Sequence, residues 1–83
     1  MLSAAQCRAA RALLSWSQTD LAQRAGVGVI TVHQFEAETG QPRRATIEVI
    51  WRAFDKADIE FIDENGGGAG VRFKNRSASG RKK

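Results

Sequence analysis

Two side chains are suited to nucleophilic, acid–base or metal chemistry, Cys7 and His33, and the sequence contains one cysteine and one histidine. A lone thiol can form no disulfide within the chain, and one cysteine with one histidine cannot assemble a zinc site. No acidic residue stands at a spacing that suggests a catalytic triad with either of them. We therefore expect that the protein is not an enzyme, that it binds no metal or other cofactor, and that Cys7 is a small buried apolar residue.

The glycine-rich stretch GGGAG at residues 66–70 raises the question of a phosphate-binding loop. Such a loop is followed by Lys-Ser or Lys-Thr and by the start of a helix, and neither follows here. A flexible loop between two strands explains the glycines better, and we predict no small-molecule ligand.

The charge of the chain is unevenly distributed. The net charge is +4, which by itself points toward nucleic acid. Of the 13 basic residues, five lie from Lys74 to the C-terminus with no acidic residue among them, which leaves eight basic and all nine acidic residues in 1–73. The excess therefore belongs to the tail, which would add sequence-independent attraction to phosphates. A tail that only keeps the protein soluble is equally compatible with this composition.

Length and hydropathy narrow the class of protein further. Eighty-three residues suffice for one domain with one small core. No apolar run approaches the roughly 20 residues that span a bilayer, and the N-terminus lacks the order of a signal peptide. We expect a cytoplasmic protein that is not associated with a membrane.

The sequence predicts two capped helices in its N-terminal part. Ser3 and Gln6 have the spacing of a capping box, and strong helix formers follow over residues 4–14. Ser17 and Asp20 repeat that spacing at the start of a second, shorter helix. Trp16, between the two helices, is expected to insert into the core.

Two further helices and a hairpin are predicted after Gly26, a residue suited to the left-handed backbone that ends a helix. The third helix covers about residues 29–37. A fourth, from about Ala45 to Ala57, has apolar residues at i, i+3, i+4 and i+7. These residues are Ile47, Ile50, Trp51 and Phe54. The alternating segments IEFI and VRFK, residues 59–62 and 71–74, then predict a β-hairpin.

The segment SQTDLAQRAGVGVITVHQFE, residues 17–36, carries the most specific pattern. It has the small Ala22 where two helices would cross, Gly26 at a turn that needs positive φ, and the aliphatic Val32 as an anchor in the core. At these residues the chain resembles the Xre/Cro-like (lambda-repressor-like) helix-turn-helix family. The resemblance covers about residues 3–57.

The resemblance implies a mainly α fold, a four-helix lambda-repressor-like helix-turn-helix domain with a C-terminal β-hairpin. We expect the domain to occupy residues 1–58 and the hairpin extension residues 59–74. The segment IEFIDENGGGAGVRF is similar to an extension found on small bacterial members of the family. Residues 75–83 have nothing to bury and are predicted to form a disordered basic tail.

The resemblance also implies that the helix at about residues 29–37 lies in the major groove of DNA, with Val32 and Phe35 facing the core. Gln34 is the best candidate base reader, because a carboxamide can bond to adenine N6 and N7 together. The exposed β-branched Val29 and Ile30 depart from the usual polar residues and could pack against thymine methyl groups. The predicted base-reading residues are Val29, Ile30, Thr31, His33 and Gln34.

Phosphate contacts are expected at the start of the second helix, where free N–H groups and the helix dipole favour anions, and just before the fourth helix. The predicted phosphate-binding residues are Ser17, Gln18, Gly28, Arg43 and Arg44. In the resembled fold, the positions of Arg11 and Glu36 hold an ion pair between the first helix and the recognition helix, for which we predict a structural role.

Together these observations predict a transcriptional regulator that binds a short, palindromic site in double-stranded DNA as a homodimer. An alternative from another class stays open. The same fold could serve as a protein-interaction module, antitoxin-like or an anti-activator, in which Val29 and Ile30 form an apolar patch for a protein partner.

Overall fold

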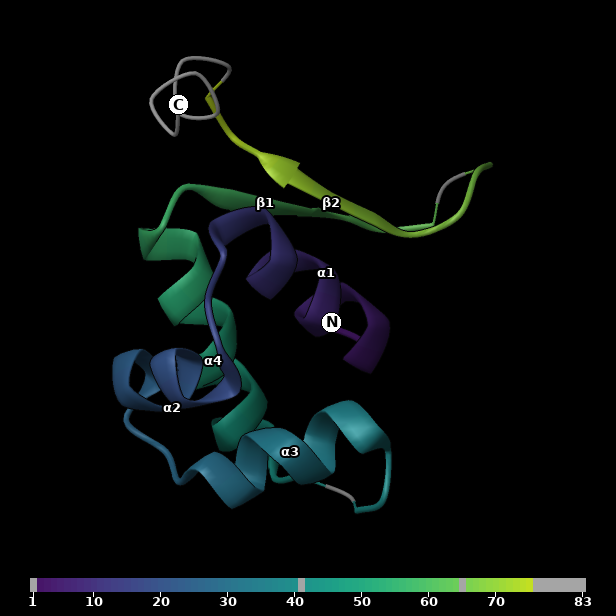
Figure 1. The fold of residues 1–83 in the computed structure, drawn as a ribbon. Helices are drawn as coiled ribbons and strands as arrows, with labels where there is room; N and C mark the ends of the chain where they lie inside the picture. Colours follow the sequence, from purple (N-terminus) through teal and green to yellow (C-terminus); the bar gives the residue numbers. More distant parts are fainter. Residues whose placement is uncertain (1, 41, 65, 76–83) are drawn as a thin grey trace.

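The computed structural model describes residues 2–40, 42–64 and 66–75. Its helices are α1 (Ala4–Leu14), α2 (Gln18–Ala25), α3 (Val29–Ala37) and α4 (Arg44–Lys56), and its strands are β1 (Ile59–Ile62) and β2 (Gly70–Phe73). Figure 1 shows α3 at one end of the molecule, the antiparallel hairpin at the other, and α4 running from the α3 end toward the hairpin. The predicted fold class is thus confirmed. Of the tail that we predicted to be disordered, residues 75–83, all but Asn75 lie outside the described residues.

The boundaries of the first two helices follow from local chemistry. In α1 the Ser3 Oγ accepts the Gln6 N–H at 3.1 Å, while the Gln6 Oε1 accepts the Ser3 N–H at 3.0 Å. In α2 the Ser17 Oγ and the Asp20 carboxylate make the same reciprocal pair at 3.0 and 2.9 Å. Gly26 ends α2 with φ +74°, the left-handed conformation that the sequence predicted. Both capping boxes are confirmed.

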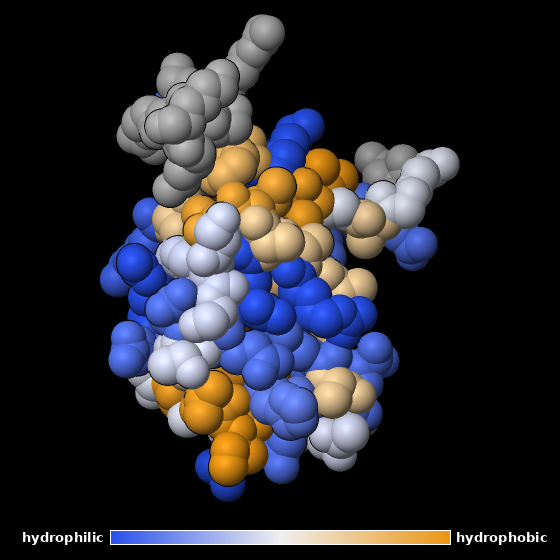
Figure 2. Space-filling view, viewed as in Figure 1, coloured by the Kyte–Doolittle hydropathy of each residue, from blue (hydrophilic) through white to orange (hydrophobic). Residues whose placement is uncertain are grey.

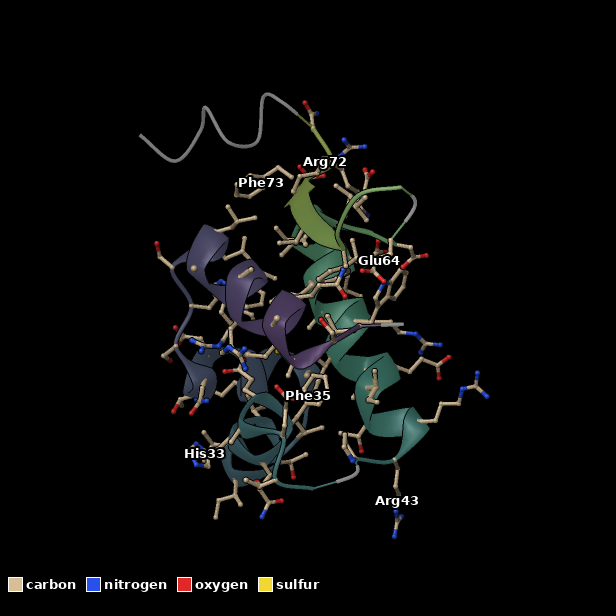
Figure 3. The ribbon with its side chains drawn as sticks, turned by 90° about the vertical axis from the view of Figure 1, so that its right-hand side faces the viewer. His33, Phe35, Arg43, Glu64, Arg72 and Phe73 are labelled. Carbon is tan, nitrogen blue, oxygen red and sulfur yellow. The ribbon has the colours of Figure 1, made fainter. Side chains whose placement is uncertain are left out.

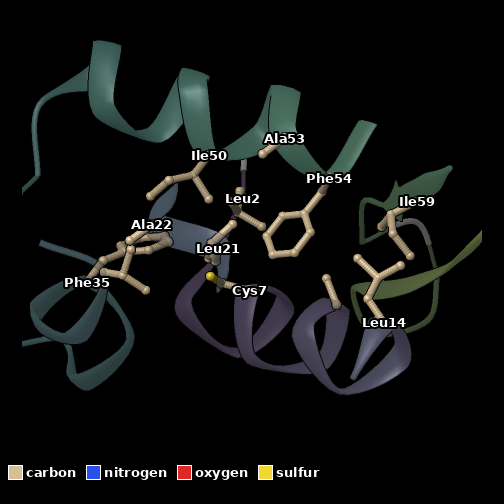
Figure 4. Packing of buried hydrophobic residues seen from close by; sticks show 12 residues of the cluster. Leu2, Cys7, Leu14, Leu21, Ala22, Phe35, Ile50, Ala53, Phe54 and Ile59 are labelled. Carbon is tan, nitrogen blue, oxygen red and sulfur yellow. The ribbon is translucent and has the colours of Figure 1, made fainter. Parts of the chain in front are cut away.

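The core lies where the four helices meet the hairpin (Figure 4). Cys7, Leu21, Val32, Ile50 and Phe54 are completely buried in it. The ring of Trp16 stacks on that of Phe54 with centroids 5.6 Å apart, and the rings of Phe61 and Phe54 make a T-shaped contact with centroids 5.8 Å apart. Trp16 therefore packs against the core, as predicted.

The prediction that Trp51 lies on the buried apolar face of α4 is wrong. Its side chain is 39% exposed, whereas Ile50 and Phe54 are completely buried and Ala53 nearly so. The buried strip of α4 is thus narrower than the sequence suggested, and Trp51 lies outside it. The aromatic partners of Phe54 come instead from the α1–α2 connection and from β1.

The hairpin has one apolar face and one charged pair on the other. Ile59 pairs with Phe73 and Phe61 with Val71, and all four side chains pack on the core. Between these pairs, Glu60 and Arg72 form an exposed ion pair of 2.7 Å on the opposite face. β2 begins and ends one residue earlier than predicted. Within the described residues, no helix is long and apolar enough to cross a membrane.

Two polar side chains hold the hairpin on the helices. The buried Gln6 donates from Nε2 to the carbonyl oxygens of Ile62 and Gly70, at 3.3 and 2.9 Å, so the residue that caps α1 also binds both strands of the hairpin. Lys74 lies against the end of α4, where its Nζ is 2.5 Å from the Asp55 carboxylate. Lys74 therefore does not contribute free charge to the basic tail with which the sequence grouped it.

Candidate nucleic-acid interface

α3 turns one side to the core and the other to solvent. Val32 is completely buried and Phe35 is 8% exposed, which confirms that they hold the helix from behind. On the outer side, Val29 is 42% and Ile30 67% exposed. His33 and Gln34 are also exposed, and Thr31 is half-buried. In Figure 3 His33 lies on the outer side of α3, while Phe35 lies toward the rest of the molecule.

The exposed apolar residues of α3 gather near the N-terminal end of the helix. Figure 2 shows an apolar patch at this end of the molecule, separated by a mostly hydrophilic band from a second apolar area over the hairpin. Gly28 precedes the patch as the N-cap, with extended backbone and no side-chain cap. A Cβ added to Gly28 would come no closer than 4.0 Å to Thr31 Oγ1, so the site is open.

The C-terminal end of α3 is fixed by Glu36, whose side chain is buried. Its two carboxylate oxygens accept hydrogen bonds from Arg11 Nε and Nη2, both at 2.7 Å. Cys7 Sγ and Gln18 Nε2 donate to the same carboxylate at 3.0 Å each. Arg8 donates to the Glu36 backbone carbonyl. The predicted Arg11–Glu36 ion pair is confirmed, and it is part of a larger cluster, here called the Glu36 cluster: Cys7, Arg8, Arg11, Gln18 and Glu36.

The Glu36 cluster sets the protonation state of its members. Burial opposes ionisation of Glu36, but hydrogen bonds from Arg11, Cys7 and Gln18 hold the pKa of the carboxyl below its ordinary value. Burial and the hydrogen bond to Glu36 raise the pKa of the Cys7 thiol far above its ordinary value. Cys7 is therefore a protonated donor in the core, which adds a polar role to the apolar one that we predicted.

The start of α2 offers less to a phosphate than the sequence suggested. The Gln18 side chain is turned to Glu36, so the predicted contact at this residue would rest on its backbone N–H. The Ser17 N–H is already bonded to the Asp20 carboxylate. That carboxylate accepts bonds from the Ser17 backbone and side chain, which lower its pKa. It therefore places a negative charge where a phosphate would come.

Arg43 and Arg44 lie at the same end of the molecule as α3. Arg43 is the N-cap of α4, and both side chains are exposed. In Figure 3 Arg43 extends away from the body at the end where His33 also lies. The structure thus places the start of α4, which carries both arginines, at the same end of the molecule as α3.

Sequence reasoning missed the other members of the Glu36 cluster. Arg11 is four residues after Cys7 and three after Arg8, so a helix places Arg11 beside each of them, and that spacing was a usable signal. The inward turn of Gln18 had no such signal, because its partner lies on another helix. Among the described residues, no group of three or more His, Cys, Asp or Glu side chains could hold a metal ion.

Comparison with known proteins decides the family. A family model described as helix-turn-helix matches residues 8–61, about two thirds of the chain. The chain belongs to the helix-turn-helix family. The match confirms the Xre/Cro-like resemblance, and it extends past the expected limit at residue 57 into β1. Helix-turn-helix domains bind DNA, so at this general level the protein is a DNA-binding regulator. No curated protein sequence matches the chain.

Proposed function

We propose that this helix-turn-helix protein is a sequence-specific transcriptional regulator that reads the major groove with the outer side of α3. Val29, Ile30, Thr31, His33 and Gln34 would contact base edges. Ser17, Gln18, Gly28, Arg43 and Arg44 would contact phosphates and fix the register on the duplex. As a regulator of transcription, the protein would act in the cytoplasm.

One observation carries this proposal. The outer side of α3 is free of contacts with the protein's own core, while Val32, Phe35 and Glu36 fix the helix from behind. Insertion into a major groove requires a helix that is held in place on one side and exposes side chains on the other. Gln34, His33 and Thr31 supply hydrogen-bonding groups, and Val29 and Ile30 supply methyl groups for contact with thymine.

A mobility-shift assay against genomic fragments tests this function. The full chain should select a subset of fragments at physiological salt. Gln34→Ala should weaken binding to the selected fragments by about 1–3 kcal/mol and relax the preference at one base position. Gln23→Ala is the matched control, since Gln23 is an exposed glutamine on α2. Failure of the wild type to bind any fragment at low salt would contradict the proposal.

The exposed apolar pair Val29 and Ile30 favours a second candidate function. An apolar patch at the tip of a short helix could hold a protein partner, which would make the chain an antitoxin-like or anti-activator module. In that case DNA binding would be absent or unselective at low salt, and Ile30→Ser would abolish capture of the partner. We prefer the DNA-reading function, because the arginines at the same end of the molecule suit phosphates.

The regulator would bind as a homodimer to a palindromic operator. One short helix reads only a few base pairs, and two copies about 34–36 Å apart read two half-sites on one side of the duplex. The basic tail would add affinity without selectivity. Deletion of residues 75–83 should therefore lower the affinity and the salt dependence of binding and leave the choice of fragments unchanged.

A further inference from the structure

Two adjoining depressions lie between α2 and α4, which pack against each other on one flank of the molecule. Three exposed basic side chains line them: Arg24, Arg52 and Lys56. Among the described residues, no acidic side chain lines these depressions, and none of the three forms an ion pair. We propose that this surface, here called the basic flank, binds an acidic amphipathic helix of a partner protein.

The three positive charges of the basic flank come from two helices. Arg24 lies in the last turn of α2, and its guanidinium lies 4.5 Å from the centre of the Trp16 ring. This cation–π contact orients the guanidinium before any ligand arrives. Arg52 and Lys56 stand at i and i+4 on α4, where like charges repel. The helix dipoles favour Arg24 and Lys56 one by one, but they do not explain three charges around one surface.

The acidic residues of α2 and α4 are engaged elsewhere. Asp20 caps the start of α2, and Asp55 forms an ion pair with Lys74. Glu48 lines a separate groove beside Trp51. The positive charge of the basic flank is therefore open to carboxylates from outside the chain.

Between the basic residues, the basic flank is lined by small apolar side chains: Ala25, Val49, Ala53 and Ala57. Ala53 is buried and the others are half-buried, so these residues form the floor below the exposed cations. Small side chains leave a groove between two helices into which the larger side chains of another helix can pack. A helix with leucines on one side and carboxylates beside them is the complement of such a surface.

The apolar floor favours a protein over a nucleic acid as the partner. A phosphate backbone could pair with the three cations, but it has no apolar group to place on the alanines and the valine. Binding through phosphates alone would also fall steeply with salt. An acidic amphipathic helix would use both the charges and the floor, so part of its affinity should persist at high salt.

The basic flank leaves the outer side of α3 uncovered. α4 runs from the α3 end toward the hairpin (Figure 1), and Arg52 and Lys56 lie in its second half. None of the residues proposed to contact bases or phosphates lines the basic flank. The chain can therefore hold DNA and an acidic partner together and bring that partner to the operator. This consequence rests on the function proposed above.

A peptide titration of the isotope-labelled full chain, followed by NMR, tests the binding surface. The probe is a synthetic amphipathic helix of roughly 16 residues with leucines along one side and glutamates beside them. It should shift the amide signals of residues that line the basic flank. Two control peptides, one with glutamine for every glutamate and one with alanine for every leucine, should each bind at least about tenfold more weakly.

A pair of charge reversals on α4 provides the matched variants. Arg52→Glu should raise the peptide Kd at least about tenfold, because it sets a like charge against the peptide. Arg44→Glu makes the same change in net charge at an exposed arginine outside the basic flank, and it should leave that Kd within about twofold. Circular dichroism checks that both variants are folded. Equal peptide affinity in Arg52→Glu and the wild type would overturn the proposal.

The outcomes separate this inference from the regulator proposed above. Peptide-induced shifts confined to α3 or to the groove beside Trp51 would overturn the inference. It would also be overturned if poly-glutamate or an unselected DNA duplex bound the basic flank as tightly as the peptide does. A chain that binds the peptide there but no DNA fragment would support the inference and contradict the regulator. Selective DNA binding without any response to the peptide would do the reverse.

Discussion

The two ends of α3 are built in opposite ways. At the C-terminal end, Glu36 is 4% exposed and accepts hydrogen bonds from side chains of α1 and α2. At the N-terminal end, Gly28 provides no side-chain cap and Ile30 is 67% exposed. The C-terminal end, here called the fixed end, therefore determines where the helix lies. The N-terminal end, here called the free end, is exposed and can contact a ligand. Substitutions at the two ends should separate stability from recognition.

The largest expected effect is at the fixed end. Arg11→Ala would leave the buried Glu36 carboxylate without its ionic partner, which should lower the free energy of unfolding by about 3–5 kcal/mol. Urea denaturation measures this loss. Arg8→Ala is the control, because Arg8 is exposed and donates only to a backbone carbonyl, and it should cost less than about 1 kcal/mol.

Replacing both partners sharpens the same test. A chain with Arg11→Met and Glu36→Met has no uncompensated charge and should be more stable than Arg11→Ala alone. If the double variant is as unstable as Arg11→Ala, the hydrogen bonds of the Glu36 cluster stabilise the fold themselves. The loss in Arg11→Ala would then not be due to the unpaired buried charge alone.

The pH dependence of stability should also originate at the fixed end. The pKa of Glu36 in the folded protein lies below the ordinary value of 4.5, so folding favours the ionised carboxylate. Its contribution is fully present above pH 4.5 and is lost as the pH falls through the folded pKa. Chemical denaturation at pH 6 and pH 3 should show a smaller loss of stability in Glu36→Gln than in the wild type. Asp20→Asn serves as a comparison, since the pKa of the exposed Asp20 is also lowered.

At the free end, substitutions should change binding and leave stability alone. Ile30→Ser should alter the free energy of unfolding by less than about 0.5 kcal/mol, because the side chain is largely exposed. It should weaken binding to the selected DNA about tenfold through lost contact with thymine methyl groups. Unchanged DNA affinity would indicate that Ile30 contacts something other than the duplex.

The smallest expected effect concerns the open N-cap of α3. Gly28→Ser introduces a capping hydroxyl into space that is free, at a backbone with negative φ, and should stabilise the protein by a few tenths of a kcal/mol. A decrease in DNA affinity in the same variant would indicate that a phosphate approaches this backbone closely. A decrease in stability would show that the space around residue 28 does not accommodate the serine side chain.

The contrast between the ends of α3 explains which features could be predicted. Val32 and Phe35 are three residues apart, and the resemblance to the family placed both of them toward the core, where the structure has them. Trp51 follows the helical spacing of the apolar residues of α4 and is nevertheless exposed, since periodicity gives the side of a helix and not the width of the strip that its neighbours cover. Gln6 was recognised as a cap, but its bonds to the hairpin join residues more than 50 positions apart.

The amino-acid sequence by itself determined the helices, their caps, the turn at Gly26 and the membership of the family, because these depend on residues within about one or two turns of one another. Tertiary structure alone decided that Gln18 and Cys7 donate to Glu36, that Lys74 is held by Asp55, and that Trp51 is left exposed. Those contacts depend on how separate elements pack, and packing brings together side chains whose proximity no local spacing encodes.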